Sequence, residues 1–308
     1  MRVTVLAGGP SNEREISLTS GRAVAAALKA AGHHVHFADV QPEDLSALDV
    51  PADVVFPVLH GAWGESGELQ EILEARGVPF VGSGSAASRL GMDKIATKRA
   101  WQAAGLPTPP FRLVEAPVIR TAPGPCVVKP VAGGSSIDTF LRKDAAPEEP
   151  TDIEGPVSYL VAKYGRCMVE QFVDGYELTV GILFDRALPP IWIDPGEGQW
   201  FDYQQKYSPS GAAHRFDLPP VIDAAGVAAL QEMCLDAHRV IGCRDLSRVD
   251  VMLDRAGRPF LLEVNTMPGF TGRSLLPDAA REAGLDFPSL CDALATHAAR
   301  RAGEAVAA

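Results

Sequence analysis

The sequence predicts an α/β protein with two or three domains. Its 308 residues exceed the length of one typical domain. Hydrophobic residues make up 46% of the chain and aromatic residues only 7%, a balance that suits helices packed closely on sheets. Within residues 1–90, short apolar runs alternate with segments whose apolar positions have helical spacing. This alternation predicts a parallel sheet with helices on its faces.

The first 92 residues carry the clearest alternation. Residues 3–6 form an apolar run that ends in glycines, and residues 15–31 have apolar positions at helical spacing. A helix over 93–104 then stops at Gly105, before a stretch rich in proline, so we place the first domain boundary near residue 92. Loops at the carboxyl ends of parallel strands usually bind ligands. The other elements expected here are strands at 35–38, 54–58 and 80–81 and a helix at 68–75.

The later residues predict more strands. A strand at 126–128 leads into a glycine–serine loop, and residues 144–156, rich in proline and glutamate, predict an exposed connection. Two further strands are expected at 169–173 and 177–183. The last pattern is a hairpin, in which strands 248–253 and 260–264 flank a turn at 254–257.

The composition excludes several kinds of partner. The chain carries 28 basic and 39 acidic residues, a formal charge of −11, which argues against nucleic acid. No apolar run of about 20 residues predicts a membrane span, and the N-terminus lacks a signal-peptide pattern, so we expect a cytoplasmic protein without a membrane partner. The five cysteines have no metal-ligand spacing and predict reduced thiols. We interpret His33, His34 and His36 as a solvated strand start rather than a metal site.

The predicted hairpin brings two carboxylates face to face. Side chains alternate along a strand, so Arg248 and Asp250 share one face, as do Glu263 and Asn265. With the turn at 254–258, Asp250 and Glu263 lie opposite each other. Opposed carboxylates are unfavourable unless a cation lies between them. Mg²⁺ prefers such oxygen ligands, with phosphates and water completing the shell. The alternative interpretation is a polar, solvent-facing side of a sheet.

Two weaker patterns point to a nucleotide. Lys129 precedes a loop containing Gly133 and Gly134, and glycines allow backbone N–H groups to surround a phosphate. The order differs from a P-loop, and a plain tight turn explains the loop equally well. Residues 170–173 could contact adenine through the backbone of a strand edge, with the Glu177 carboxylate on the ribose hydroxyls.

These motifs and others in the same order resemble those of ATP-grasp enzymes, and closely those of the D-alanine–D-alanine ligase family. Each is modest alone, but together they are highly specific. The matching stretches run through nearly the whole chain: 8–17, 60–61, 64–65, 82–84, 92–94, 128–130, 134–136, 202–203, 206–207, 248–250, 263–269 and 274–275.

The resemblance implies an ATP-grasp fold of three domains with ATP held between two sheets, α/β overall and α+β in the ATP-binding part. Residues 1–92 are then the N-terminal domain that binds the first substrate, and residues 93–173 are the central ATP-grasp domain. Residues 174–308 are the C-terminal ATP-grasp domain, which carries the magnesium site and a lid at 198–215.

The resemblance also implies which residues hold ATP and its metal. Three lysines contact the phosphates, three other residues frame adenine and ribose, and three oxygen ligands hold two magnesium ions, for which Mn²⁺ can substitute. In that order they are Lys94, Lys129 and Lys206; Glu170, Val173 and Glu177; and Asp250, Glu263 and Asn265.

The remaining implied roles concern two D-alanine substrates. Glu13 fixes the ammonium of the first, Ser135 and Tyr207 form a hydrogen-bonded lid contact with Glu13, and His60 lies nearby. Arg248 binds the acyl phosphate and the oxyanion. The carboxylate of the second D-alanine is held by Ser274 and the backbone of Leu275.

The implied activity is ATP-dependent synthesis of D-alanyl-D-alanine, for peptidoglycan precursors, by a homodimer. Two alternatives stay open. One is a ligase of the same fold that uses D-lactate or D-serine as acceptor. The other is a nucleotide-binding homologue that has lost catalysis, although a mere binder would not need Arg248, Asp250, Glu263 and Asn265 together.

Three short stretches depart from the family pattern. Gly133 stands where the family usually has an acidic residue, and Ile137-Asp138 stand where it usually has Val-Gly. Ser66 replaces the aspartate of a Glu-Asp-Gly sequence. These changes touch the phosphate loop and the first substrate's surroundings, so they bear on substrate fit rather than on reaction class.

Overall fold

The computed structural model describes residues 1–143, 146, 149–194, 196, 213–271 and 274–307. Its N-terminal part is a three-stranded parallel sheet in the order β2-β1-β3. The strands are β1 (Arg2–Gly8), β2 (His34–Val40) and β3 (Val54–Pro57). The buried positions of α1 (Arg14–Ala30), among them Val24 and Leu28, pack on this sheet, as the helical spacing predicts. The short elements that follow are η1 (Ser46–Asp49), α2 (Ala62–Glu65), α3 (Glu68–Ala75) and α4 (Ser85–Met92).

A second, antiparallel sheet of four strands has the order β4-β9-β6-β7. Its strands are β4 (Phe111–Val114), β6 (Cys126–Pro130), β7 (Phe140–Arg142) and β9 (Cys167–Gln171), and α6 (Glu154–Tyr164) packs on β6 and β9. A separate pair, β5 (Thr121–Pro123) and β8 (Pro150–Asp152), lies beside it. The prediction of an exposed connection over 144–156 is therefore wrong at its end, where residues 150–152 pair with β5 and residue 154 begins α6.

A third sheet has six strands in the order β13-β12-β10-β14-β15, with β11 paired to β10. The predicted hairpin is β14 (Leu246–Asp254) and β15 (Pro259–Asn265), and α8 (Ala224–Ile241) packs on this sheet. The other strands are β10 (Gly175–Leu183), β11 (Arg186–Ala187), β12 (Ile191–Asp194) and β13 (Ala213–Arg215). This mixture of helices with three larger sheets and one two-stranded sheet is the α/β fold that the sequence predicts.

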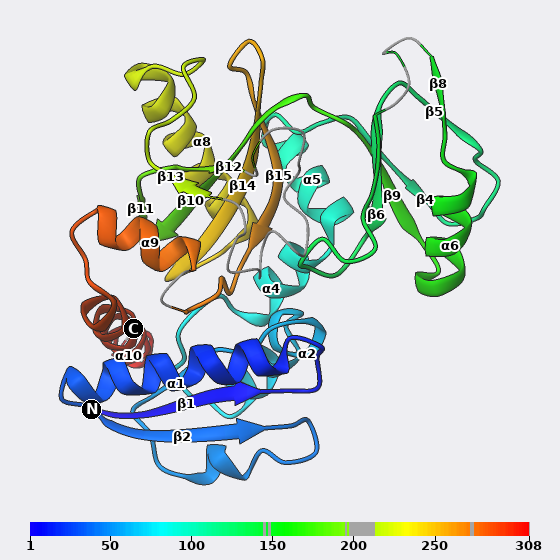
Figure 1. Cartoon of the computed structure of the whole chain (residues 1–308). Coiled ribbons are helices and arrows are strands. Elements are labelled where there is room, and N and C mark those ends of the chain that lie inside the picture. The colour runs from blue at the N-terminus through cyan, green and yellow to red at the C-terminus, as the bar shows by residue number, and fades with distance from the viewer. Residues whose placement is uncertain (144–145, 147–148, 195, 197–212, 272–273, 308) are drawn as a thin grey trace.

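Two helices pack on sheets that lie far away in the sequence. The α5 helix (Lys94–Ala103) contacts α8 and β15, and Trp101 of α5 belongs to the core of the six-stranded sheet. The C-terminal helix α10 (Phe287–Ala307) returns to the N-terminal sheet and lies beside α1 (Figure 1). The α9 helix (Leu275–Glu282) lies between α10 and the six-stranded sheet (Figure 1). Long-range packing therefore joins the N-terminal sheet to the six-stranded sheet.

The histidines at the start of β2 match the interpretation as a strand start. His34 and His36 are exposed, and His33 pairs with Asp292 of α10, with 2.7 Å between Nε2 and Oδ1. No group of three or more His, Cys, Asp or Glu residues is arranged to hold a metal ion in the described part of the chain. Among the helices of the described residues, none is long and apolar enough to cross a membrane.

Candidate active site

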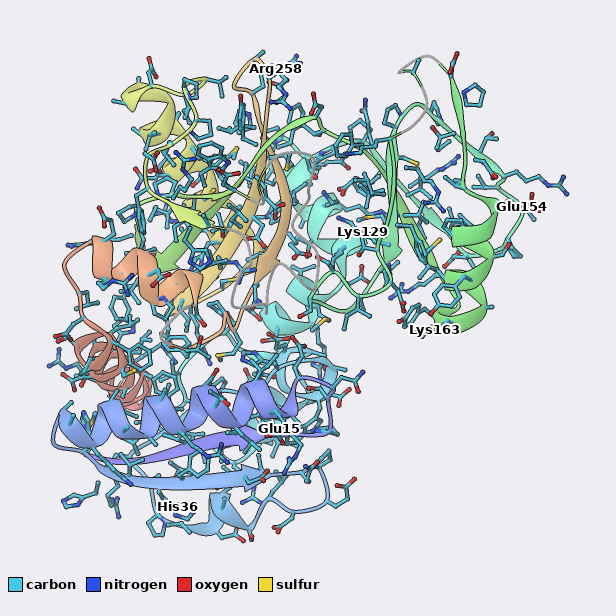
Figure 2. All side chains as sticks on the ribbon, in the orientation of Figure 1. Glu15, His36, Lys129, Glu154, Lys163 and Arg258 are labelled. Carbon is cyan, nitrogen blue, oxygen red and sulfur yellow. The ribbon has the colours of Figure 1, made fainter. Side chains whose placement is uncertain are left out.

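A cavity of about 710 Å³ lies between the four-stranded and the six-stranded sheets. Its walls come from β6 and β9 on one side and from β10, β12, β14 and β15 on the other, and Lys129 projects between them (Figure 2). Apolar side chains such as Phe172, Met252 and Leu262 line it beside charged groups, a mixture typical of small-molecule sites. Seven sequence-predicted site residues line it: Lys94, Lys129, Glu170, Val173, Glu177, Asp250 and Glu263.

The β14–β15 hairpin presents the carboxylates as the sequence predicts. Asp250 pairs with Glu263 in the register, and Arg248 pairs with Asn265. Arg248 donates from Nε and from Nη2 to the two oxygens of Asp250, both at 2.9 Å, while Lys94 Nζ lies 3.3 Å from Glu263 Oε2. The register prediction is confirmed. In this structure, the side chains of Arg248 and Lys94 offset the negative charge of the two opposed carboxylates.

The donor set of the hairpin fits magnesium. Asp250 and Glu263 contribute carboxylate oxygens, and the amide oxygen of Asn265 accepts a hydrogen bond from Met267 N at 2.9 Å. A second anchor for Asp250 is Thr179 Oγ1, which donates to Oδ1 at 2.6 Å. Mg²⁺ is commonly bound by one or two carboxylates and completes its shell with phosphates and water. Two carboxylates and an amide oxygen beside a cavity of nucleotide size meet that requirement.

A buried ion triad, which the sequence analysis missed, lies at the base of the cavity. Glu170 forms ion pairs with Lys129, at 2.7 Å from Oε2 to Nζ, and with Lys98 through Oε1. Burial alone would raise the pKa of Glu170, but the two ammonium groups outweigh it and lower the pKa. Lys98 itself is fully buried, and burial lowers its pKa to about 8. Glu170 is therefore ionised, and it fixes the position of Lys129.

Lys98 also joins the two sheets that form the cavity. Its Nζ donates to Thr108 Oγ1 at 2.5 Å and to the carbonyl oxygen of Leu261, on β15, at 3.1 Å, while Glu170 lies on β9. One sequence signal could have found it. Lys98 lies three residues from both Ile95 and Trp101, so it occupies the apolar stripe of α5, where a lysine must have buried partners.

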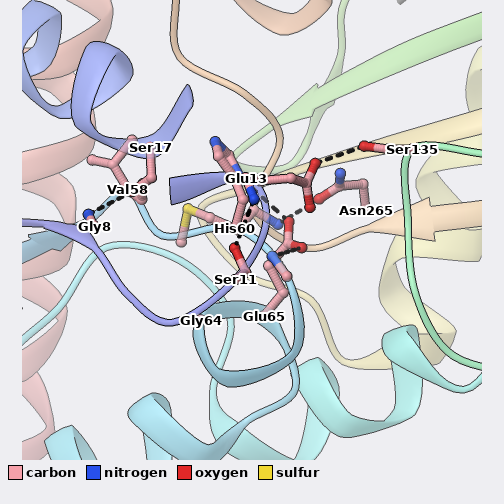
Figure 3. Close-up of polar contacts among 12 residues, drawn as sticks. Gly8, Ser11, Glu13, Ser17, Val58, His60, Gly64, Glu65, Ser135 and Asn265 are labelled. Atoms are coloured by element: carbon pink, nitrogen blue, oxygen red, sulfur yellow. Dashed lines mark hydrogen bonds and ion pairs between the residues drawn. The ribbon is translucent and has the colours of Figure 1, made fainter. Parts of the chain in front are cut away.

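The glycine–serine loop (residues 132–139) contacts the N-terminal part of the chain. Lys94 Nζ donates to the carbonyl oxygen of Gly133 at 2.6 Å, and Ser135 Oγ donates to Glu13 Oε1 at 2.6 Å (Figure 3). Glu13 is held in turn at the N-terminus of α1, where its backbone N–H donates to Ser11 Oγ at 3.2 Å. A smaller cavity of about 50 Å³ connects this region to the hairpin, with Glu65, Lys94, Gly134, Glu263 and Asn265 in its lining.

His60 lies buried below Glu13. Its Nδ1 is 3.6 Å from Glu65 Oε1, and Glu65 Oε2 accepts the N–H of Gly61 at 2.8 Å (Figure 3). Burial alone would lower the pKa of His60, but Glu65, with a further contribution from Glu13, outweighs it and leaves the pKa above its ordinary value. Within the described residues, His60 Nε2 is buried without a hydrogen-bond partner. That nitrogen is available to a polar ligand group.

Two of the departures from the family pattern, Gly133 and Ser66, leave the contacts of Glu65 in place. Gly133 adopts a φ of 115°, and nothing lies within 4 Å of the position where a Cβ would stand, so an acidic residue would find space but a strained backbone. Ser66 Oγ is buried and has no hydrogen-bond partner in the described structure. Glu65, beside it, keeps its ion pair with His60 and still accepts the hydrogen bond from the N–H of Gly61.

The predicted second-substrate residues lie at the start of α9. Ser274 is its N-cap residue and Leu275 its first residue. Ser274 Oγ accepts the backbone N–H of Thr271 at 2.9 Å, so the hydroxyl is fixed beside the helix N-terminus. Backbone N–H groups at a helix N-terminus favour an anion such as a carboxylate. One turn further along, Asp278 Oδ2 lies 2.7 Å from His214 Nδ1.

Two predicted residues and most of the predicted lid lie outside the described residues. These are Lys206, Tyr207 and residues 198–212 of the segment 198–215. The last three residues of that segment, 213–215, form β13, which pairs with β12 at the edge of the six-stranded sheet.

This fold and this cavity, with its lysines and opposed carboxylates, define an enzyme of the ATP-grasp class. The family model described as "D-ala D-ala ligase C-terminus" matches residues 100–296, and the one described as "D-ala D-ala ligase N-terminus" matches residues 38–83. The chain belongs to the D-alanine–D-alanine ligase family.

Individual relatives agree with this assignment. The D-alanine–D-alanine ligase of Gloeobacter violaceus is 41% identical over 299 residues, covering 94% of this chain and 97% of the relative. That of Azoarcus sp. is 42% identical over 300 residues, covering 95% and 96%. The crystal structure of D-alanine–D-alanine ligase from Bacillus anthracis superimposes with a TM-score of 0.83 at 27% identity, covering 98% of both chains.

Proposed function

We propose that this protein ligates two D-alanine molecules to D-alanyl-D-alanine at the expense of ATP, through an acyl phosphate. The observation that carries the proposal is the shared cavity. Lys94 and Lys129 line it together with Asp250 and Glu263, in a chain of the D-alanine–D-alanine ligase family. The product serves peptidoglycan precursor synthesis, and we place the enzyme in the cytoplasm as a homodimer.

The nucleotide site follows from the two sheets. The lysines Lys94, Lys129 and, by resemblance, Lys206 bind phosphate oxygens. Val173 frames the adenine and Glu177 binds the ribose. Because the carboxylate of Glu170 is already held by Lys98 and Lys129, we propose that it acts on the nucleotide through Lys129. When bound at Asp250, Glu263 and Asn265, two magnesium ions would offset the negative charge of the transferring phosphate.

The reaction needs two substrates held in line. Glu13 binds the ammonium of the first D-alanine, close to His60. The carboxylate of this D-alanine then attacks the γ-phosphate of ATP, which forms the acyl phosphate and releases ADP. The guanidinium of Arg248 stabilises the acyl phosphate and the oxyanion that forms when the second amine attacks. Ser274 and the N–H of Leu275 bind the carboxylate of that second D-alanine. We assign Ser135 and Tyr207 to the contact that closes over Glu13 and excludes water from the acyl phosphate.

A coupled assay tests the function. Purified protein with ATP, magnesium and D-alanine should release ADP and phosphate in equal amounts and form the dipeptide, as mass spectrometry of the products would show. L-Alanine, as a matched control, should give neither. Failure of D-alanine to stimulate ADP release would contradict the proposal and favour a homologue that has lost catalysis.

We propose D-alanine rather than D-lactate or D-serine as the acceptor. By resemblance, Lys206-Tyr207 is the sequence of ligases that form the dipeptide. His214, however, contacts Asp278 of α9, close to the predicted second site. A protonated imidazole near the second site would repel an ammonium and favour a hydroxy acid. With D-alanine and D-lactate at equal concentration, the dipeptide D-alanyl-D-alanine should dominate from about pH 6 to about pH 9. Mainly D-alanyl-D-lactate at the acid end would show that His214 or another group selects the acceptor.

A further inference from the structure

The glycine–serine loop is fastened to α6 by Asp138, a residue that departs from the family pattern. Lys163 Nζ donates to Asp138 Oδ2 at 2.8 Å, and Tyr159 OH donates to Oδ1 at 3.2 Å. Tyr164 OH also donates to Oδ2. All three donors lie on the last turns of α6, and Figure 2 labels Lys163 there. The carboxylate of Asp138 thus accepts hydrogen bonds from three side chains of one helix.

The donors are themselves prearranged. The ammonium of Lys163 lies 5.4 Å from the ring centre of Tyr159 and 5.2 Å from that of Tyr164, within the range of cation–π attraction. Tyr159 packs edge-on against Phe140, with 5.8 Å between ring centres. Phe140 is the first residue of β7, the strand that follows the loop. Binding to this group lowers the pKa of Asp138, with the hydrogen bond from Lys163 as the largest cause. Asp138 is therefore ionised when it binds α6.

The backbone of the loop needs such support. Ser135, Ser136 and Asp138 have φ values of 56°, 56° and 54°, a left-handed conformation that residues other than glycine adopt only at a cost. The other described side-chain contacts of the loop reach different parts of the chain. Lys94 of α5 binds Gly133, and Glu13 at the start of α1 binds Ser135. The contact through Asp138 is made with α6, which packs on β6 and β9 of the loop's own sheet.

We propose that Asp138 is a positioning residue that, through Lys163, Tyr159 and Tyr164, holds the glycine–serine loop in its phosphate-binding shape before nucleotide arrives. This inference rests on the proposed function for its kinetic consequence but not for its structural one. In the ligand-free protein the loop is already held by its own sheet and helix, so less order is lost when a phosphate binds.

The test compares Asp138→Asn with Lys163→Met. Asparagine tolerates the left-handed backbone but removes the charge, and methionine removes the ammonium from the helix side. Millisecond hydrogen exchange of residues 132–139 in the ligand-free protein should be about fivefold faster in each variant, the size expected for a half-exposed ionic contact. The KM for ATP should rise about fivefold with kcat nearly unchanged. The double variant should behave like either single variant, because both remove one contact.

A matched control is Glu154→Gln, which removes the same charge from the first turn of α6, where Glu154 lies 3.7 Å from Arg120 and away from the loop. It should change neither loop exchange nor KM. Unchanged loop exchange in Asp138→Asn and Lys163→Met, or additive effects in the double variant, would overturn the inference. Absence of ligase activity in the parent would overturn the proposed function instead, and the exchange measurement would still decide the role of Asp138.

Discussion

The β14–β15 hairpin and the glycine–serine loop face the same cavity but are held in different ways. The hairpin's shape is local, because strand register places Asp250 opposite Glu263 and Arg248 opposite Asn265. The loop depends on contacts with Glu13, Lys94 and α6, which lie far from it in the sequence. A change in the hairpin should therefore damage the chemistry directly, whereas a change in the loop should alter how readily the site is assembled.

The largest effect is expected at the hairpin. Glu263→Gln keeps the shape of the side chain but removes a charge that the metal requires, so turnover at saturating magnesium and ATP should fall about a thousandfold. Phosphate release in a continuous assay measures it. Glu232→Gln, at an exposed position on α8, is the matched control and should behave like the parent. Parental turnover in Glu263→Gln would show that the metal assignment is wrong.

The difference between the two regions also explains what the sequence could predict. Alternation along two adjacent strands was enough to place Asp250 opposite Glu263, and helical spacing was enough to locate α1. The same alternation placed Arg248 beside Asp250, but Lys94, the cation beside Glu263, could not be placed by local pattern, because it comes from α5. The roles of Lys98 and Asp138 were missed for the same reason, since their partners are brought near by tertiary packing.

The second effect concerns the triad that links the hairpin to the opposite sheet. Lys98→Met keeps the apolar stem but leaves Glu170 with one cation and leaves the carbonyl of Leu261 without its lysine donor. Breaking a buried ionic contact should lower the free energy of unfolding by about 3 kcal/mol. The KM for ATP should rise as well, because Lys98 no longer holds Glu170, the partner that fixes Lys129. Urea unfolding checks the first effect and initial rates the second.

The control for the triad is Lys29→Met, at an exposed position near the end of α1. It removes the same charge without a buried partner and should leave both quantities unchanged. If Lys98→Met were as stable as this control, the triad would contribute nothing to the junction between the sheets.

A smaller effect is expected in the loop. Ser135→Ala removes the donor to Glu13 Oε1. Loss of a hydrogen bond to a charged group should lower kcat/KM for the first D-alanine about tenfold. Ser135→Gly also lacks the hydroxyl but suits the left-handed backbone better. Equal losses in both variants would assign the effect to the hydroxyl. Full activity in Ser135→Gly would assign it to backbone strain and remove Ser135 from the proposed contact.

The smallest effect separates the two regions by pH. Behind the hairpin, His238 of α8 is buried, and its Nδ1 lies 2.7 Å from Ser247 Oγ on β14. Burial lowers its pKa from 6.5 to about 4, with Arg239 acting in the same sense and Asp185 and Asp245 against it. The folded protein then binds fewer protons than the unfolded chain between these two values, so stability falls as pH drops through 6.5.

From about pH 7.5 to about pH 6, His238 should account for about 1 kcal/mol of lost unfolding free energy. His238→Asn can keep a polar contact with Ser247 but does not titrate, so the parent should lose about 1 kcal/mol more than the variant over this range. Subtracting the two profiles removes the contribution of His60, whose raised pKa acts in the opposite direction.

Hydrogen exchange in the glycine–serine loop, corrected for its intrinsic pH dependence, should differ little between parent and variant, because the contacts of His238 lie behind the hairpin. Parallel stability profiles would show that His238 is protonated in the folded protein. A change confined to the loop would show that the two regions are coupled, contrary to the separation that their contacts indicate.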